Sequence, residues 1–228
     1  MSAGPAVDAR DAAAVILAGG RATRLCRIDK TALARDGVTL LAGAVRAAAG
    51  CARTVVVGAG NRAGGVPRAH QEATGSALLV DEDPPYGGPA AALGAGVAAL
   101  GDDPACAWIL VLAADLPHAA AAVAALLPLR RGSGVDGHDA LVARDPDGRA
   151  QPLLALYRPD PLRAALDAVD RADGLAGASL RAVLAALRPG AVAHADLDAR
   201  LCADVDLPAD ADVHGLRLLD DGIPAHGR

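Results

Sequence analysis

The sequence predicts an α/β fold, a three-layer α/β/α sandwich on a Rossmann-like, mainly parallel sheet. Short, fully apolar runs that suit strands buried on both faces are the first observation. Segments of helical length separate these runs, which is the element order of a parallel sheet with crossover helices. Glycines or aspartates directly follow several of the runs, where such a fold binds its ligands. With 228 residues, no internal repeat and no interdomain linker, we expect a single domain.

The first half of the chain alternates between predicted strands and helices. An apolar strand over Ala12–Ala18 follows a polar lead, residues 1–11, that we expect to be disordered. Gly50 ends the next predicted helix, and Pro89 fits the first turn of the helix after it. A glycine-rich loop at 60–75 and a dense turn at 81–88 separate further strands. The remaining predictions, in chain order, are a helix over Thr39–Ala49, strands over Thr54–Gly58 and Ala77–Val80, a helix over Pro89–Leu100 and a strand over Trp108–Ala113.

The second half continues the pattern up to the last turn of the chain. An Asp-Pro-Asp-Gly turn at 145–148 predicts that two strands flank it. The predicted elements are a helix over Ala119–Leu127, strands over Asp139–Ala143 and Leu153–Tyr157, helices over Asp160–Val169 and Ser179–Leu187, a short strand leading to Asp204–Asp206 and a helix after Pro208. We expect the domain to span residues 12–215, followed by a C-terminal tail, residues 216–228, that frays from about Gly222.

Composition argues against several classes of protein. The formal net charge is −5 and there is no basic tract, so we expect no nucleic-acid or membrane partner. Only Tyr86, Tyr157 and Trp108 offer rings for stacking on a base, which argues against a binder of single-stranded nucleic acid. The four cysteines show no CxxC and no zinc-like pairing with histidine. With no signal peptide or apolar run of transmembrane length, we expect a cytoplasmic protein.

Lys30 is the only lysine among the 22 basic residues of the chain. It lies eleven residues after Gly19, in a glycine-containing loop that follows the first predicted strand. A compact ammonium group suits close contact with one oxygen atom, whereas arginine serves equally well on a solvated surface. The position therefore favours phosphate chemistry over a lysine that simply escaped the arginine bias of the composition.

Each distinctive polar element of the sequence falls at the carboxyl end of a predicted strand. Gly19 and Gly20 would let backbone N–H groups approach phosphate oxygens, although paired glycines after a strand are also common in plain tight turns. Asp115, after a long apolar strand, is well placed to hold Mg²⁺ together with substrate phosphates, or to cap the next helix. Asp206 has the same two interpretations. Because these elements, with Gly58 and Asp81, all fall at strand ends, we expect them to converge at one edge of the sheet.

In combination, these motifs resemble the molybdenum cofactor guanylyltransferase family, among the nucleotidyltransferases of the nucleotide-diphospho-sugar transferase type. The opening pattern of that family is LAGGxxxRMGGxDK, and this chain has Leu17-Ala18-Gly19-Gly20 and then Arg24, Asp29 and Lys30 at the same spacing. Further matches follow in order: Gly88-Pro89 before a helix, Asp115-Leu116-Pro117 after a strand, Gln151-Pro152-Leu153 after a turn, and Asp204-Val205-Asp206-Leu207-Pro208.

The resemblance implies transfer of GMP from GTP to the terminal phosphate of molybdopterin, with release of pyrophosphate. Leu17, Ala18 and Gly19 would contact guanine and ribose through the backbone, Lys30 would neutralise phosphate charge, and Asp115 would bind the nucleotide and Mg²⁺. It also implies a transient contact with molybdoenzymes or cofactor-biosynthesis proteins. The other residues carried over are Arg24 as a second phosphate contact, Gly20, Gly58, Asp81 (with Asp83 as competitor) and Gly88 on the nucleotide side, Gln151 and Asp206 on the acceptor side, and Asp206 as a second metal ligand.

The chain departs from the family pattern at Cys26 and Arg27, where the family has paired glycines. Either the loop is remodelled, with Arg27 as an added phosphate contact, or activity is weakened and a nucleotide-binding relic remains. A related enzyme that uses CTP, or that activates a sugar phosphate or phospholactate, is the nearest alternative. A NAD-dependent dehydrogenase shares the α/β pattern but would need a GxGxxG motif, which the chain lacks.

Overall fold

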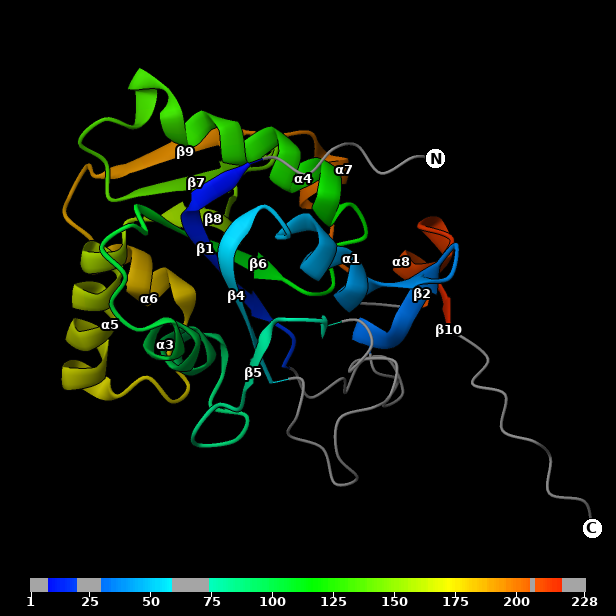
Figure 1. The fold of residues 1–228 in the computed structure, drawn as a ribbon, viewed down its shortest axis with the longest axis horizontal. Coiled ribbons are helices and arrows are strands. Elements are labelled where there is room, and N and C mark those ends of the chain that lie inside the picture. The colour runs from blue at the N-terminus through cyan, green and yellow to red at the C-terminus, as the bar shows by residue number, and fades with distance from the viewer. Residues whose placement is uncertain (1–7, 20–29, 59–73, 206–207, 219–228) are drawn as a thin grey trace, which may run out of the picture.

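The computed structural model describes residues 8–19, 30–58, 74–205 and 208–218. Seven strands form one sheet in the spatial order β5-β4-β1-β6-β8-β7-β9 (Figure 1). Their bounds are β1 Ala9–Leu17, β4 Cys51–Val57, β5 Leu78–Val80, β6 Trp108–Ala113, β7 Ala140–Arg144, β8 Ala150–Tyr157 and β9 Val192–Asp196. The strands β5, β4, β1 and β6 run parallel to one another, and β7 is parallel to β9. Because only β8 runs against its two neighbours, the mainly parallel sheet predicted from the sequence is confirmed.

Helices cover both faces of this sheet, which confirms the three layers. One layer holds α1 (Leu40–Ala47) and α4 (Ala119–Leu126), and the other holds α3 (Pro89–Leu100), α5 (Pro159–Asp173) and α6 (Leu180–Ala185) (Figure 1). Alternate residues of β1 divide between the layers. Ala12, Ala14 and Ile16 belong to the core under α1 and α4, whereas Ala13, Val15 and Leu17 belong to the core under α3, α5 and α6. Both apolar faces of β1 are therefore buried, each under its own layer of helices.

A small antiparallel sheet lies beside the large one and was not predicted. It consists of β2 (Leu33–Arg35), β3 (Val38–Thr39) and β10 (Arg217–Leu218), in the order β10-β2-β3. Its own core contains buried residues from distant parts of the chain: Leu33, Leu40, Val205, Ala211 and Leu216. This sheet joins the segment after Lys30 to the end of the chain, where α8 (Pro208–Val213) precedes β10. Residues 216–218, expected to be tail, are therefore part of the folded body.

The first strand begins at Ala9, three residues before the predicted start, so residues 9–11 are strand rather than a disordered lead. A buried guanidinium accounts for the difference. Arg130, which follows α4 in a 3₁₀ helix (Leu127–Arg131), has a side chain only 1% exposed. It donates hydrogen bonds to both Asp11 carboxylate oxygens, over 2.6 and 3.1 Å, and to the carbonyl oxygens of Asp8 and Leu127. These bonds fix the start of β1 against the neighbouring layer.

The predicted last strand, leading to Asp204, is also wrong. The strand is β9 at Val192–Asp196, and the short helix α7 (Ala199–Cys202) stands between it and Asp204. Asp204 is exposed and Val205 enters the core of the small sheet. The segment around Asp204 therefore lies beside the small sheet and does not continue a strand of the large one.

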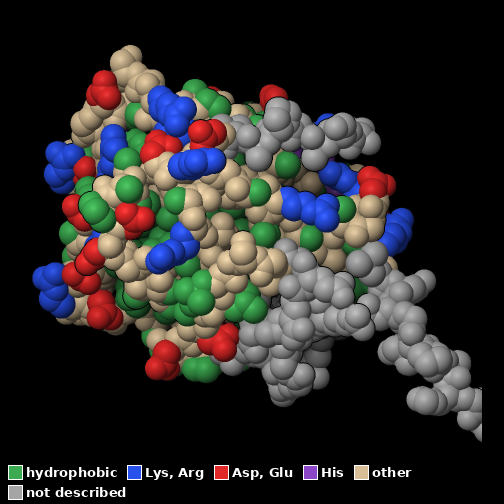
Figure 2. Space-filling model, viewed as in Figure 1, with side chains coloured by type: hydrophobic (Ala, Val, Ile, Leu, Met, Phe, Trp, Pro, Cys, Tyr) green, Lys and Arg blue, Asp and Glu red, His purple; other side chains and the backbone are tan. Residues whose placement is uncertain are grey.

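Side chains of opposite charge are interspersed over the face of the molecule in Figure 2. Among the described residues, none of the helices combines the length and the apolar character that a membrane crossing requires.

Candidate active site at the carboxyl ends of the strands

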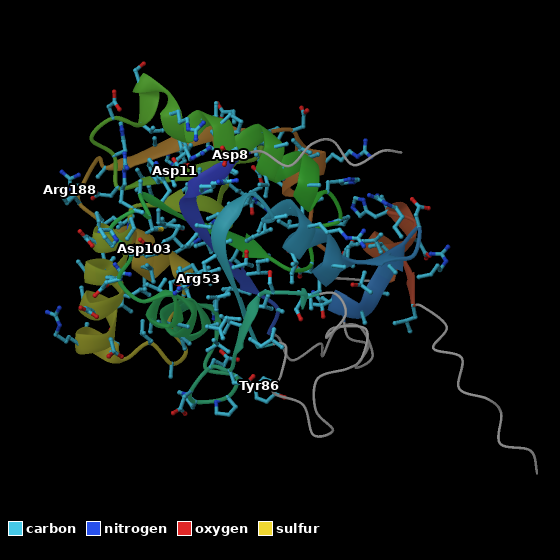
Figure 3. The ribbon with its side chains drawn as sticks, in the orientation of Figure 1. Asp8, Asp11, Arg53, Tyr86, Asp103 and Arg188 are labelled. Carbon is cyan, nitrogen blue, oxygen red and sulfur yellow. The ribbon has the colours of Figure 1, made fainter. Side chains whose placement is uncertain are left out.

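The four adjacent parallel strands end at one edge of the sheet, and backbone pairing continues past their ends. Ala18 donates to the carbonyl of Val57 over 2.8 Å, Gly58 to that of Val80 over 2.9 Å, and Ala114 to that of Leu17 over 3.0 Å. Figure 3 shows Tyr86 near this edge, at the end of the sheet opposite Asp8 and Asp11. The convergence that the sequence predicted for Gly19, Gly58, the 81–88 turn and Asp115 is therefore present.

Gly58 and Gly19 lie in direct backbone contact at this edge. Gly58 has a φ of +82°, a left-handed conformation that glycine adopts without strain. A β-carbon built on Gly58 would lie 2.7 Å from the Cα and 2.8 Å from the N of Gly19. Only glycine fits at position 58 without moving the loop after β1. The absence of a side chain at Gly58 therefore shapes the backbone at the end of Leu17-Ala18-Gly19.

Lys30 and Asp115 form an ion pair, with 3.8 Å between Nζ and Oδ2. Lys30 opens a short 3₁₀ helix (Lys30–Ala32), and Asp115 follows the end of β6. The side chains are 19% and 24% exposed, so both remain within reach of a ligand. The two residues are 85 positions apart in the chain, and the fold places opposite charges side by side at the carboxyl end of the sheet. This pair is the centre of the candidate site.

Glu82 is the residue that sequence reasoning missed. Its side chain is 7% exposed, whereas Asp81, the predicted nucleotide contact, is exposed. Glu82 Oε1 accepts a hydrogen bond from the backbone N–H of Tyr86 over 3.0 Å, and burial raises the pKa of this carboxyl above its ordinary value. A β-carbon on Gly19 would lie 3.5 Å from the same oxygen. The carboxylate of Glu82 therefore lies beside the loop after β1 while it bonds the 81–88 turn.

The turn that Glu82 holds leads directly into α3. Tyr86 has a φ of +60°, which is strained for a residue with a side chain, and the Glu82 carboxylate holds its N–H in place. Gly88, with a φ of +91°, is the cap residue before Pro89, as the sequence predicted for the start of this helix. The only sequence signal for Glu82 was that it is one of two glutamates in the chain.

Gln151 reaches the same edge from the antiparallel strand β8. Leu112 of β6 pairs with Leu154, and Gln151 lies three residues before it on β8, opposite Ala143 of β7. The Gln151 side-chain amide donates to the Asp145 carboxylate over 3.0 Å, which ties it to the neighbouring turn. The predicted site residues Gly20, Arg24 and Asp206 lie outside the described residues, as do Cys26 and Arg27.

The described part of the chain contains no group of three or more His, Cys, Asp or Glu side chains arranged to hold a metal ion. Mg²⁺ does not need one, since one or two carboxylates and substrate phosphates suffice. The partly exposed carboxylate of Asp115 has the oxygen donors that this ion prefers, and thus fits the role that the sequence suggested.

Comparisons with known proteins agree on the type of domain. A family model described as the MobA-like NTP transferase domain matches residues 14–192. A probable molybdenum cofactor guanylyltransferase from Natronomonas pharaonis is 32% identical over 160 residues, which cover 70% of this chain and 74% of that protein.

Solved structures share the fold at lower identity. The crystal structure of Rv0371c from Mycobacterium tuberculosis H37Rv matches with a TM-score of 0.65 and 21% identity, over 91% of this chain and 98% of that one. The inositol-1-phosphate CTP transferase from T. maritima matches with a TM-score of 0.63 and 14% identity, over 92% and 95% of the two chains. These structures confirm the fold of the sandwich.

Proposed function

This chain is a nucleotidyltransferase that belongs to the MobA-like NTP transferase family, and we propose that it transfers GMP from GTP to the terminal phosphate of molybdenum-loaded molybdopterin. The observation that carries the chemistry is the Lys30–Asp115 pair at the carboxyl ends of the parallel strands. The choice of nucleotide and acceptor is supported by the name of the relative from Natronomonas pharaonis and by the Leu17-Ala18-Gly19-Gly20 motif.

The reaction makes one phosphoanhydride bond and breaks another. An oxygen of the acceptor phosphate attacks the α-phosphorus of GTP, the bond between the α-phosphorus and the bridging oxygen breaks, and pyrophosphate leaves with that electron pair. The attacking group is already an anion, so the protein has no need of a strong base. Catalysis then depends on positioning and on the neutralisation of phosphate charge.

The residues of the site divide these tasks. The glycine contact between Gly19 and Gly58 leaves the backbone open to close approach by the nucleotide. Lys30, oriented by Asp115 in the free protein, exchanges that partner for phosphate oxygens when GTP binds. Asp115 would then hold Mg²⁺, which supplies further neutralisation of the phosphates when bound.

Pyrophosphate release by the purified protein tests this proposal. The reaction contains Mg²⁺, GTP and molybdenum-loaded molybdopterin, with parallel reactions in which CTP or UTP replaces GTP. We expect release that requires the acceptor, is fastest with GTP, and falls by a factor of about 100 or more in Lys30→Ala and in Asp115→Ala. Asp167→Ala, which removes an exposed carboxylate from α5, is the matched control and should retain full activity.

Each departure from this result identifies a different error. A clear preference for CTP would refute the choice of nucleotide. GTP binding without pyrophosphate release would point to the inactive relic that the Cys26-Arg27 loop allows, or to another acceptor. Full activity in Asp115→Ala would show that the Asp115 carboxylate has no role in catalysis.

A further inference from the structure

Four cationic or imidazole side chains gather beside the loop that carries Asp115. We propose that Arg35, His118, Arg200 and His214, hereafter the basic cluster, form the subsite that binds the phosphate group of the acceptor. The proposal rests on the transferase function proposed above, which it deepens, because it assigns residues to the second substrate of the same site.

The basic cluster is assembled from four separate segments. Arg35 ends β2, His118 is the residue before α4, Arg200 lies in α7, and His214 follows α8. Arg35 donates from Nη2 to the carbonyl of Pro117 over 3.2 Å, and Arg200 donates from Nε to the Nε2 of His118 over 3.1 Å. The rings of His118 and His214 meet edge to face, with centroids 5.3 Å apart. A tertiary fold that gathers such groups concentrates positive charge at one place.

The two arginines of the cluster are not neutralised by the described part of the protein. No described carboxylate lies within ion-pair distance of Arg35 or Arg200. Arginines nearby do pair: Arg144 with Asp196 and Arg217 with Asp212. Arginine is suited to bidentate contact with phosphate oxygens. The two guanidinium groups, like those of Arg53 and Arg158, bond groups other than carboxylates, but Arg35 and Arg200 lie together beside the Asp115 loop, where their donors suit phosphate oxygens.

The electrostatic environment of His118 agrees with this geometry. Burial, followed by the positive charges of Arg200, Arg35 and His214, lowers the pKa of His118 to about 4. His118 is thus neutral at physiological pH, and its Nε2 is free to accept from Arg200. The helix α4 begins at the next residue, and its N-terminus adds further partial positive charge.

The position of the basic cluster assigns it to the acceptor rather than the nucleotide. In the sheet order, the loops with Gly19, Gly58 and Glu82 follow β1, β4 and β5, on one side of Asp115. Arg200 instead follows β9, the strand at the opposite end of the sheet, and Arg35 contacts the carbonyl of Pro117, two residues beyond Asp115. Lys30 and Arg35 are five residues apart and contact Asp115 and the Pro117 carbonyl respectively. The transferred phosphorus would lie between the two sides, near the Lys30–Asp115 pair.

Anion binding can be measured independently of turnover. The full chain, with isotope-labelled histidine, is titrated with inorganic phosphate, with methyl phosphate, and with sodium chloride at equal ionic strength, and the ring signals are followed by NMR. We expect both phosphates, but not chloride, to shift the His118 and His214 signals saturably. In Arg35→Met/Arg200→Met the affinity should fall about tenfold or more, with recovery in Arg35→Lys/Arg200→Lys. Arg181→Met, which removes one exposed arginine from α6, is the control for a loss of surface charge away from the cluster.

Turnover supplies the second arm, with GTP and molybdenum-loaded molybdopterin as substrates. The Met double variant should raise the KM for the acceptor about tenfold or more and leave the KM for GTP within about twofold. The subsite is refuted by phosphate shifts no larger than those with chloride, by equal loss in Arg181→Met, or by a rise confined to the KM for GTP. Phosphate binding that depends on both arginines, in a protein inactive toward molybdopterin, would support the subsite and refute the proposed acceptor.

Discussion

Replacement of Gly58 by alanine should damage the nucleotide side of the site more than the stability of the fold. The new methyl group would lie 2.7 Å from the Cα of Gly19, a separation at which one of the two loops must move. The movement would reach Leu17-Ala18-Gly19, the backbone segment that we propose contacts the nucleotide. The expected result is a higher KM for the nucleotide, because this segment is displaced from its binding geometry.

Two separate costs determine the loss of stability in Gly58→Ala. A left-handed φ of +82° costs alanine about 1–2 kcal/mol relative to glycine. Contact with Gly19 adds about 1–3 kcal/mol, the usual cost of overpacking. Gly174→Ala is a matched control, because Gly174 has a φ of +80° and nothing within 4 Å of a built β-carbon. It should show only the first cost.

Thermal denaturation and nucleotide kinetics measure these two effects. For a chain of this size, about 1 kcal/mol corresponds to about 2–4 °C in Tm. We expect a fall of about 2–8 °C for Gly174→Ala with an unchanged nucleotide KM. Gly58→Ala should lose about 4–20 °C and raise the KM about tenfold or more, since small displacements cost much in positioning. Equal Tm values and equal KM values for the two variants would refute the role assigned to the Gly58–Gly19 contact.

Three further perturbations test other parts of the structure. Arg130→Met should lower the free energy of unfolding, measured in urea, by about 2–4 kcal/mol, because it leaves the acceptors of a buried guanidinium unpaired. Arg131→Ala removes an exposed partner of the same Asp11 and should change this free energy by less than about 0.5 kcal/mol. Equal losses in the two variants would contradict the role assigned to Arg130. Glu82→Ala should raise the KM for the nucleotide about tenfold, because the 81–88 turn loses the hydrogen bond that holds Tyr86. Glu82→Gln keeps the acceptor oxygen and should leave this KM unchanged. Steady-state kinetics of both variants test this role of Glu82. The pKa of His118 in the folded protein, about 4, lies below its ordinary value of 6.5, so the stability that this neutral ring contributes is present above pH 6.5 and is lost as pH falls towards 4. Urea denaturation across this range should show that the free energy of unfolding falls less steeply with decreasing pH in His118→Gln than in the unaltered protein. An identical pH dependence in the two proteins would exclude this contribution of His118.

The local pattern of the sequence was sufficient to predict the three layers of the fold and the edge of the sheet where the candidate site lies. Runs that are apolar on both faces, such as β1 and β6, bury both faces only in a sheet that has a layer of helices on each side. Because parallel strands end at one edge, residues that follow them in the sequence must meet there. The proximity of Gly19 to Gly58 was predictable for that reason, whereas Lys30 lies thirteen residues beyond the end of β1 and its contact with Asp115 was not.

Only the tertiary structure decided which distant groups meet and which are buried. Nothing local separates Glu82 from Asp81, and Glu82 is buried because the turn folds back over its carboxylate. Arg130 pairs with Asp11, 119 positions away in the chain, and this pairing explains why β1 begins earlier than the sequence predicted. Periodicity reports which face of one segment is apolar, whereas the pairing of charges depends on how separate segments pack. The sequence by itself therefore determined the class of the fold and the edge where chemistry occurs, and packing determined the contacts that shape that edge.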